Sequence, residues 1–207
     1  MIFNIATALG FGLVLSAFSI GALGSLIFQK NDKLANQWGS WLAIIGSLGG
    51  LVFSLAIGLS SKLLEFSVNI SSFSLLSFSF TIDLLSAFFI FVISLITLFS
   101  SIYSLGYSQH YFKKYNLGTL GFMYNLFIIG MLLVVTAANG LFFLIAWEVM
   151  AVASYFLVVY DRQDQDNIKA GTLYLIMTHI GTAFIILAFL LLYRFTGSFD
   201  FSLIKSG

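Results

Sequence analysis

Six apolar segments, each long enough to cross a lipid bilayer, constrain this chain more than any other feature of its sequence. A helix needs about 20 apolar residues to span a hydrocarbon core about 30 Å thick. We therefore predict an all-α, polytopic membrane protein in which residues 1–207 form one transmembrane domain. The expected helices cover residues 2–28, 39–60, 82–106, 119–138, 140–160 and 169–193.

Composition excludes several other classes of protein. Charged residues make up 8% of the chain, against about 25% in soluble domains, so a sizeable soluble domain is excluded. The net charge of +1 argues against a nucleic-acid partner, which would need a basic patch. The chain has no cysteine and two histidines, too few ligands for a zinc site. We expect no cofactor, no metal and no catalysis by the chain alone.

One stretch between the second and third segments has a different pattern. Apolar and polar residues alternate in residues 66–80 on both sides of Ser71 and Ser72. Period-two alternation around a turn predicts a small β-hairpin outside the bilayer. An irregular serine-rich loop is the alternative.

Basic residues predict the orientation of the chain, because Lys and Arg gather in cytoplasmic loops. The odd-numbered loops and their boundaries carry six basic residues and the opposite side carries three. We therefore expect the odd-numbered loops in the cytoplasm and both termini outside. The first group is Lys30, Lys33, Lys113, Lys114, Arg162 and Lys169, and the second is Lys62, Arg194 and Lys205.

Glu148 lies in the middle of the fifth apolar segment. A carboxylate at that depth costs about 2.5–3.5 kcal/mol on insertion scales, and such groups usually mark an ion or proton path. A structural hydrogen bond to a neighbouring helix is the alternative.

His179 is the expected partner of Glu148. At 1.5 Å per residue, Glu148 lies about 12 Å from one end of its helix and His179 about 15 Å from the opposite end of the next helix. The two are thus predicted to be neighbours near the midplane. Histidine gains and loses a proton near neutral pH, so this pair suits proton transfer. A neutral, hydrogen-bonded core histidine is the alternative.

Three further residues are candidates for the same path. Lys169 begins the sixth helix; alternatively, its side chain only extends to the membrane interface. Thr182 lies on the same side of that helix as His179; alternatively, its hydroxyl only bonds to the backbone of its own helix. Asp83 begins the third helix, where an acid also serves as a cap.

Several short motifs occur in order along the chain. They are Asp83-Leu-Leu-Ser86, Tyr103-Ser-Leu-Gly-Tyr107, Trp147-Glu148-Val-Met150 with Ser154-Tyr155, Lys169-Ala-Gly, Thr178-His179-Ile-Gly181, and Gly197-Ser-Phe-Asp200.

Together these motifs resemble the antiporter-like proton-translocating subunits of respiratory membrane complexes. That family includes complex I membrane subunits, multisubunit Na⁺/H⁺ antiporter subunits and the large membrane subunit of hydrogenase-4 and formate hydrogenlyase; the chain looks most like the hydrogenase-4 type. The resemblance implies that Glu148 is the key membrane glutamate and that His179 takes a position often basic in the family. Thr182 departs from the acid found there in some complex I subunits.

The resemblance also implies a larger fold, because family members continue to a broken seventh helix that carries a key lysine. We expect this chain to be the N-terminal part of a proton-translocating subunit of a hydrogenase-like or NADH-dehydrogenase-like complex. Its partners would be other membrane subunits, a separate chain with the missing helices, the lipid bilayer, and protons or Na⁺. A structural assembly module and a stand-alone oligomeric ion transporter are the alternatives.

Overall fold

In a computed structural model, the chain is described over residues 2–60, 64–69 and 77–206. Six helices within these ranges are long and apolar enough to cross a membrane, so the predicted polytopic membrane architecture is confirmed. The long helices are α1 (Ile2–Ile27), α2 (Asp32–Ser60), α3 (Leu84–Tyr107), α4 (Leu117–Thr136), α5 (Gly140–Val158) and α6 (Gln165–Thr196), with a 3-10 turn η1 (Ser108–Tyr111) and a short α7 (Phe201–Ser206).

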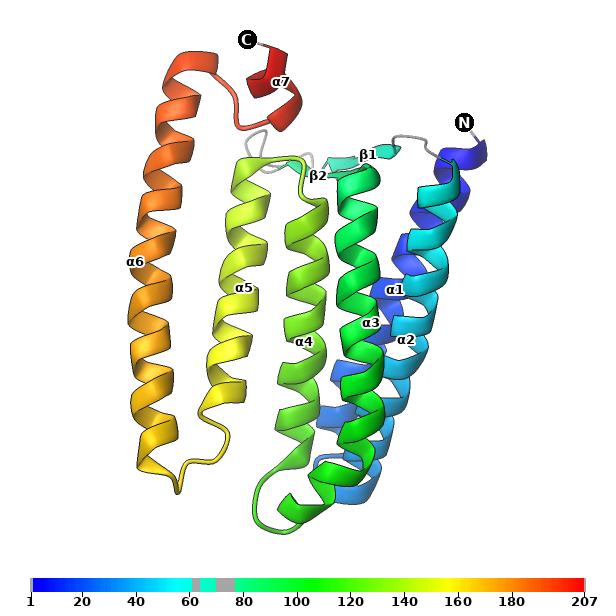
Figure 1. Cartoon of the computed structure of the whole chain (residues 1–207), viewed down its shortest axis with the longest axis vertical. Helices are drawn as coiled ribbons and strands as arrows, with labels where there is room; N and C mark the ends of the chain where they lie inside the picture. Colours follow the sequence, from blue (N-terminus) through cyan, green and yellow to red (C-terminus); the bar gives the residue numbers. More distant parts are fainter. Residues whose placement is uncertain (1, 61–63, 70–76, 207) are drawn as a thin grey trace.

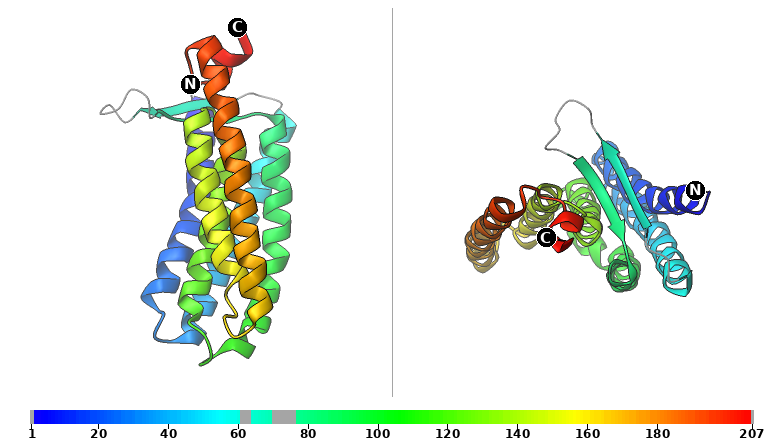
Figure 2. Two further views of the ribbon diagram at one scale, coloured as in Figure 1. Left: turned by 90° about the vertical axis from the view of Figure 1, so that its left-hand side faces the viewer. Right: turned by 90° about the horizontal axis from the view of Figure 1, so that it is seen from above.

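The first four helices form a packed bundle, and α5 and α6 extend from one side of it. α5 packs against α4, and α6 packs against α5, so the helices seen from above form an elongated group with α6 at its margin (Figure 2). Of the residues in the most apolar stretch of α1, 39% are buried within the molecule, against 6% in that of α6. Most residues of α6 are therefore at least partly accessible to lipid or to another protein.

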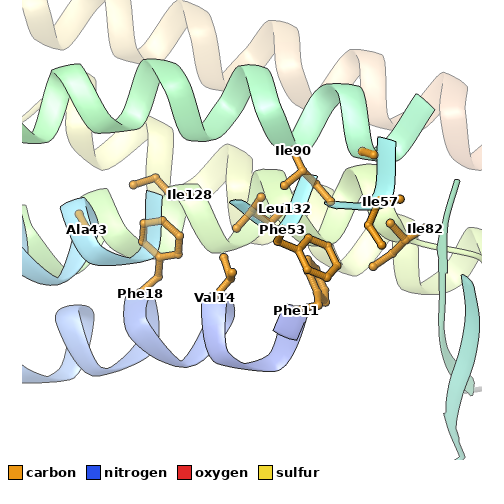
Figure 3. Close-up of a cluster of buried hydrophobic side chains, with 11 residues drawn as sticks. Phe11, Val14, Phe18, Ala43, Phe53, Ile57, Ile82, Ile90, Ile128 and Leu132 are labelled. Atoms are coloured by element: carbon orange, nitrogen blue, oxygen red, sulfur yellow. The ribbon is translucent and has the colours of Figure 1, made fainter. Parts of the chain in front are cut away.

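The apolar core lies within the bundle. Phe11 and Phe18 from α1, Ile57 from α2, Ile90 from α3 and Leu132 from α4 are all almost completely buried and point toward one another (Figure 3). Lipid tails are as apolar as these side chains, so close van der Waals packing holds such helices together in a membrane.

Close packing also fixes the position of α5 on the bundle. A Cβ atom on Gly130 of α4 would lie 2.9 Å from the backbone Cα of Met150 on α5. The missing side chain lets the two helix backbones approach closely, as small residues commonly do in membranes. Because Met150 is two residues beyond Glu148, this contact sets where Glu148 stands relative to the bundle.

A small layer of hydrogen-bonded backbone covers the end of the bundle that carries both termini (Figure 1). The predicted hairpin is present as antiparallel strands β1 (Leu64–Asn69) and β2 (Ser77–Ile82), while the predicted turn at Ser71 and Ser72 lies outside the described residues. The amide of Ala138 donates to Ser79 in β2, and the amide of Phe201 donates to Ala138. The hairpin, the α4–α5 turn and the C-terminal segment are thus joined.

Two helices are longer than their apolar segments. α2 begins at Asp32, seven residues before the predicted start at residue 39, and α6 runs from Gln165 to Thr196 rather than over residues 169–193. Local caps account for both ends of α6: Asp164 accepts the amide of Asp166 at 2.9 Å, and Gly197 ends the helix with φ +70°. Hydropathy reports the membrane span, whereas caps decide where the helix stops.

Candidate functional site

Glu148 occupies the middle of α5. Eight residues separate it from Gly140 and ten from Val158, or about 12 and 15 Å of helix. The buried residues of α5 include Ala146, Ala151 and Ala153, whereas Ile145 is exposed. The side chain of Glu148 lies between these extremes, with 38% of it exposed.

The structure places His179 of α6 beside Glu148. The Nε2 atom of His179 lies 3.8 Å from the Oε2 atom of Glu148, so the neighbours expected from matched depth are side by side. Hydrogen bonds between such atoms are about 2.7–3.2 Å long. The gap therefore closes through a small side-chain movement or through a bridging water.

The second ring nitrogen of His179 decides which nitrogen of the ring can take up a proton. Nδ1 lies 2.9 Å from the carbonyl oxygen of Leu175. A carbonyl can only accept, so Nδ1 carries hydrogen and, in neutral imidazole, Nε2 is left with its lone pair. A proton leaving Glu148 can then be taken up at Nε2 of His179, which makes an imidazolium, and it can return by the same route.

Thr182 holds α5 and α6 together one turn from this pair. Its hydroxyl accepts from Nε1 of Trp147 at 3.1 Å and donates to the carbonyl of Thr178 at 3.0 Å. Thr182 is 5% exposed. The bond to Thr178 is the bond to its own helix that was the alternative for this residue, and the bond from Trp147 gives it a positioning role as well.

Lys169 lies at the loop end of α6, well away from the pair. Its ammonium group is 3.2 Å from Asp166, and both side chains are largely exposed. Ten residues of helix, about 15 Å, separate Lys169 from His179. The structure therefore leaves Lys169 at the interface and does not bring it to Glu148.

Asp83 lies at the opposite end of the molecule, between β2 and α3. Its Oδ1 accepts the amide of Ser86 at 2.7 Å, which makes Asp83 the N-cap of α3. This is the capping role that the sequence left open. Within the described residues, no interaction joins Asp83 to Glu148 or His179.

Sequence reasoning missed a buried polar group inside the bundle. Asn125 of α4 is completely buried; its Nδ2 donates to Gly121 at 2.8 Å and to Gly39 of α2 at 3.4 Å. The sequence could have indicated this residue, because a lone Asn in an apolar helix normally hydrogen-bonds to another helix. Near it, Ser40 of α2 bonds to Ser104 of α3 at 2.8 Å. This contact could not be predicted, because the chain has so many serines that their spacing does not distinguish Ser40 or Ser104 from the others.

Polar contacts also tie the loops together at the end of the molecule opposite the termini. The hydroxyl of Tyr115 donates to Oδ1 of Asp161, which joins the loop before α4 to the loop after α5. This hydrogen bond holds the pKa of the Asp161 carboxyl below its usual value and raises the pKa of Tyr115. The amide of Lys113 donates to Asp32 at 2.7 Å, which adds the first loop to the same assembly.

Metal ligands do not gather in the part of the chain that the structure describes. No three His, Cys, Asp or Glu side chains lie close enough there to hold a metal ion.

Comparison with known proteins finds a family match in the last third of the chain. Residues 137–207 match the family described as NADH:quinone oxidoreductase/Mrp antiporter, transmembrane region. The matched region contains Glu148, Lys169, His179 and Thr182. It covers 71 of the 207 residues of the chain.

Two curated relatives show how much of a longer protein the chain represents. Hydrogenase-4 component B of Escherichia coli K12 is 41% identical over 117 residues, which cover 56% of this chain and 17% of that protein. NADH-quinone oxidoreductase subunit L of Buchnera aphidicola subsp. Schizaphis graminum is 35% identical over 81 residues, which cover 39% of this chain and 13% of that protein. The match therefore spans less than a fifth of the length of each relative.

Two solved structures share the fold of this chain. The archaeal membrane-bound sulfane sulfur reductase, a respiratory membrane complex, contains a chain that superposes with a TM-score of 0.72 at 14% identity over 93% of this chain and 39% of that one. The Mrp complex of Dietzia sp. DQ12-45-1b gives a TM-score of 0.68 at 19% identity over 96% of this chain and 20% of its counterpart.

Proposed function

We propose that this chain carries protons as part of a membrane subunit of a hydrogenase-like or NADH-dehydrogenase-like complex. The observation that carries the proposal is the approach of His179 Nε2 to Glu148 Oε2, 3.8 Å apart, half-way along α5. An acid at this depth is costly unless it has a partner or a function. The pair offers one exchangeable proton between a carboxylate and an imidazole. Protons are therefore favoured over Na⁺, which would need several oxygen ligands.

The remaining polar residues take supporting positions in this proposal. Thr182 holds α6 against α5 so that the pair stays within reach. Lys169 lies where a path from the loop end toward His179 would begin. Asp83 lies at the opposite end of the molecule, where its carboxylate is engaged as the cap of α3, and we propose no part for it in this path.

Partner subunits in the membrane complete the proposal. The half-exposed side chains of Glu148 and His179 and the open surface of α6 would be poorly matched to lipid alone. A second chain that covers α6, or the remainder of a longer protein, would shield the pair and extend its path. The two curated relatives are themselves described as components or subunits of larger assemblies.

Replacement of the acid tests the proposal directly. In the assembled complex, Glu148→Gln should abolish or strongly reduce proton uptake by inverted membrane vesicles, normalised to the amount of complex. Glutamine keeps the size of glutamate but cannot bind and release a proton. His179→Gln should give a weaker loss, because water can bridge the gap.

The matched control is Glu65→Gln, since Glu65 in β1 is the other glutamate of the chain and lies outside the helices. It should pump as the wild type does. Wild-type uptake by Glu148→Gln would leave Glu148 a packing role, which is the role expected of a structural assembly module.

The orientation is a separate proposal. We place the loop between α1 and α2, the loop between α3 and α4 that contains η1, and the loop between α5 and α6 in the cytoplasm, and both termini outside. These odd-numbered loops lie at one end of the molecule (Figure 1) and carry most of the basic residues. The cysteine-free sequence allows a clean test. In intact cells a membrane-impermeant maleimide should label Ser202→Cys in α7 and leave Gln163→Cys unlabelled. The reverse pattern would invert the topology.

A further inference from the structure

A pocket of about 300 Å³ opens between the start of α4 and the end of α5. It lies at the end of the molecule that carries the tied loops, away from Glu148. Its floor is apolar, with Leu120 and Met123 from α4 and Phe156 and Leu157 from α5. This volume is at the lower end of that of ligand pockets, and it suits a headgroup with the first part of its acyl chains.

Two cations stand at the rim of this pocket. Lys114 precedes the first residue of α4 by three positions, and Arg162 follows the last residue of α5 by four, so both lie at the level where a bilayer meets water. The ammonium of Lys114 is 5.1 Å from the ring of Tyr115, a distance at which a cation–π contact holds it over the rim. Both side chains are exposed.

One carboxylate beside the rim offsets part of this charge. None of the described residues that line the pocket is acidic, but the neighbouring Asp161 interacts electrostatically with Lys114. Asp161 also accepts hydrogen bonds on Oδ1 from the Tyr115 hydroxyl and from the amide of Gln163 at 3.2 Å. Two cations against one carboxylate leave the rim with a net positive charge, which is complementary to an anion.

Neutral donors complete the lining. Asn116 and Thr119 are polar lining residues, and Tyr160 also lines the pocket; the Tyr160 hydroxyl is buried without a hydrogen-bond partner among the described residues. A buried hydroxyl normally has one. An ester or glycerol oxygen in the pocket would supply an acceptor beside an apolar floor.

We propose that this pocket binds the phosphodiester headgroup of an anionic phospholipid, with Lys114 and Arg162 on the phosphate and the acyl chains along α4 and α5. Basic pockets between transmembrane helices are known to hold acidic lipid headgroups. The proposal does not depend on the proton path or on the direction of insertion. It assigns the loop end of α4 and α5 a lipid that would brace the helix carrying Glu148.

The test is native mass spectrometry of the delipidated full chain in detergent, titrated with phosphatidylglycerol or with phosphatidylcholine. We expect the anionic lipid to bind the wild type at least tenfold more tightly than the zwitterionic one. Lys114→Gln and Arg162→Gln should each weaken phosphatidylglycerol binding about fivefold and together remove the preference. The matched double control, Lys30→Gln with Lys33→Gln, removes two cations from the same end of the molecule and should bind as the wild type does.

Two further measurements distinguish a lipid site from a simple phosphate site and from a diffuse positive surface. Met123→Trp fills the apolar floor without changing charge, and it should weaken binding of phosphatidylglycerol while circular dichroism shows unchanged helix content. Inorganic phosphate at millimolar concentration should not displace the lipid. Equal binding of the two lipids, equal loss in the Lys30/Lys33 control, or displacement by inorganic phosphate would each overturn the proposal.

Discussion

Asn139, at the turn between α4 and α5, should contribute more to stability than any other helix cap that the structure describes. Its Oδ1 accepts the amides of Leu141 at 2.8 Å and Phe142 at 3.4 Å. Its Nδ2 donates to the carboxylate of Asp200 at 3.0 Å. Asn139 is 4% exposed, so water cannot easily replace these partners. One residue therefore begins α5 and also fastens the C-terminal segment to it.

The expected loss on Asn139→Ala follows from these two roles. Removal of an N-cap costs about 1 kcal/mol, and a hydrogen bond to a charged group contributes about 1.5–3 kcal/mol. Asp200 is only half-buried and can regain water, so the second contribution belongs at its lower end. We expect the free energy of unfolding to fall by about 2–3 kcal/mol.

Asn116→Ala is the matched control, because Asn116 is the corresponding asparagine cap of α4. It accepts the amide of Thr119 at 3.1 Å, and its own amide makes a long contact of 3.4 Å with Gln29. The side chain is exposed. Asn116→Ala removes only a helix cap, so we expect the free energy of unfolding to fall by about 1 kcal/mol.

Both variants can be unfolded with sodium dodecyl sulfate from dodecyl maltoside micelles, with circular dichroism as the probe. Hydrogen exchange supplies a local measurement: the amides of Gly140 and Phe201, which bond to Phe199 and Ala138, should exchange faster in Asn139→Ala and unchanged in Asn116→Ala. Equal losses for the two asparagines, or unchanged exchange at Phe201, would refute the assignment of a double role to Asn139.

Two smaller predictions concern the other polar contacts outside the bundle. Asp83→Asn should leave both the unfolding free energy and proton uptake near wild-type values, because asparagine caps as well as aspartate; a loss of uptake alone, measured in inverted vesicles, would add Asp83 to the proton path. Tyr115→Phe should destabilise the chain at neutral pH, with the difference shrinking as pH falls through the lowered pKa of Asp161. A carboxyl whose pKa is lowered on folding adds stability above its unfolded pKa and loses it in acid, so a pH-independent difference in detergent unfolding would contradict that contact.

The parts of the fold that follow from local chemistry could be predicted from the sequence. Apolar length alone predicts the six spans, and the alternation in residues 66–80 predicts the pairing of β1 with β2. The proximity of Glu148 to His179 could also be predicted. The rise per residue of a helix converts position in the sequence into depth, and consecutive helices run antiparallel.

The parts that depend on contacts between distant residues could not be predicted in this way. Asn139 and Asp200 are 61 positions apart, and neither residue alone indicates the other. The exposure of α6 could not be predicted either, because a helix that faces lipid and a helix that packs against other helices can both be uniformly apolar in sequence. Periodicity grouped Thr182 with His179 on one side of α6, yet Thr182 is buried against Trp147 while His179 is more than half exposed.

The difference between α6 and the four-helix bundle bears on how a proton could leave the pair. Tight packing and fixed hydrogen bonds around Asn125 leave little freedom for rearrangement inside the bundle. The Glu148–His179 pair lies outside that core, on the seam between α5 and the loosely covered α6. Because the gap of 3.8 Å closes with a small movement, displacement of α6 by a neighbouring subunit would change proton exchange without disturbing the bundle. Gly130 fixes α5 closely against α4, so a partner would act through α6, and the hydrogen bond from Trp147 to Thr182 is the contact that would resist such a displacement.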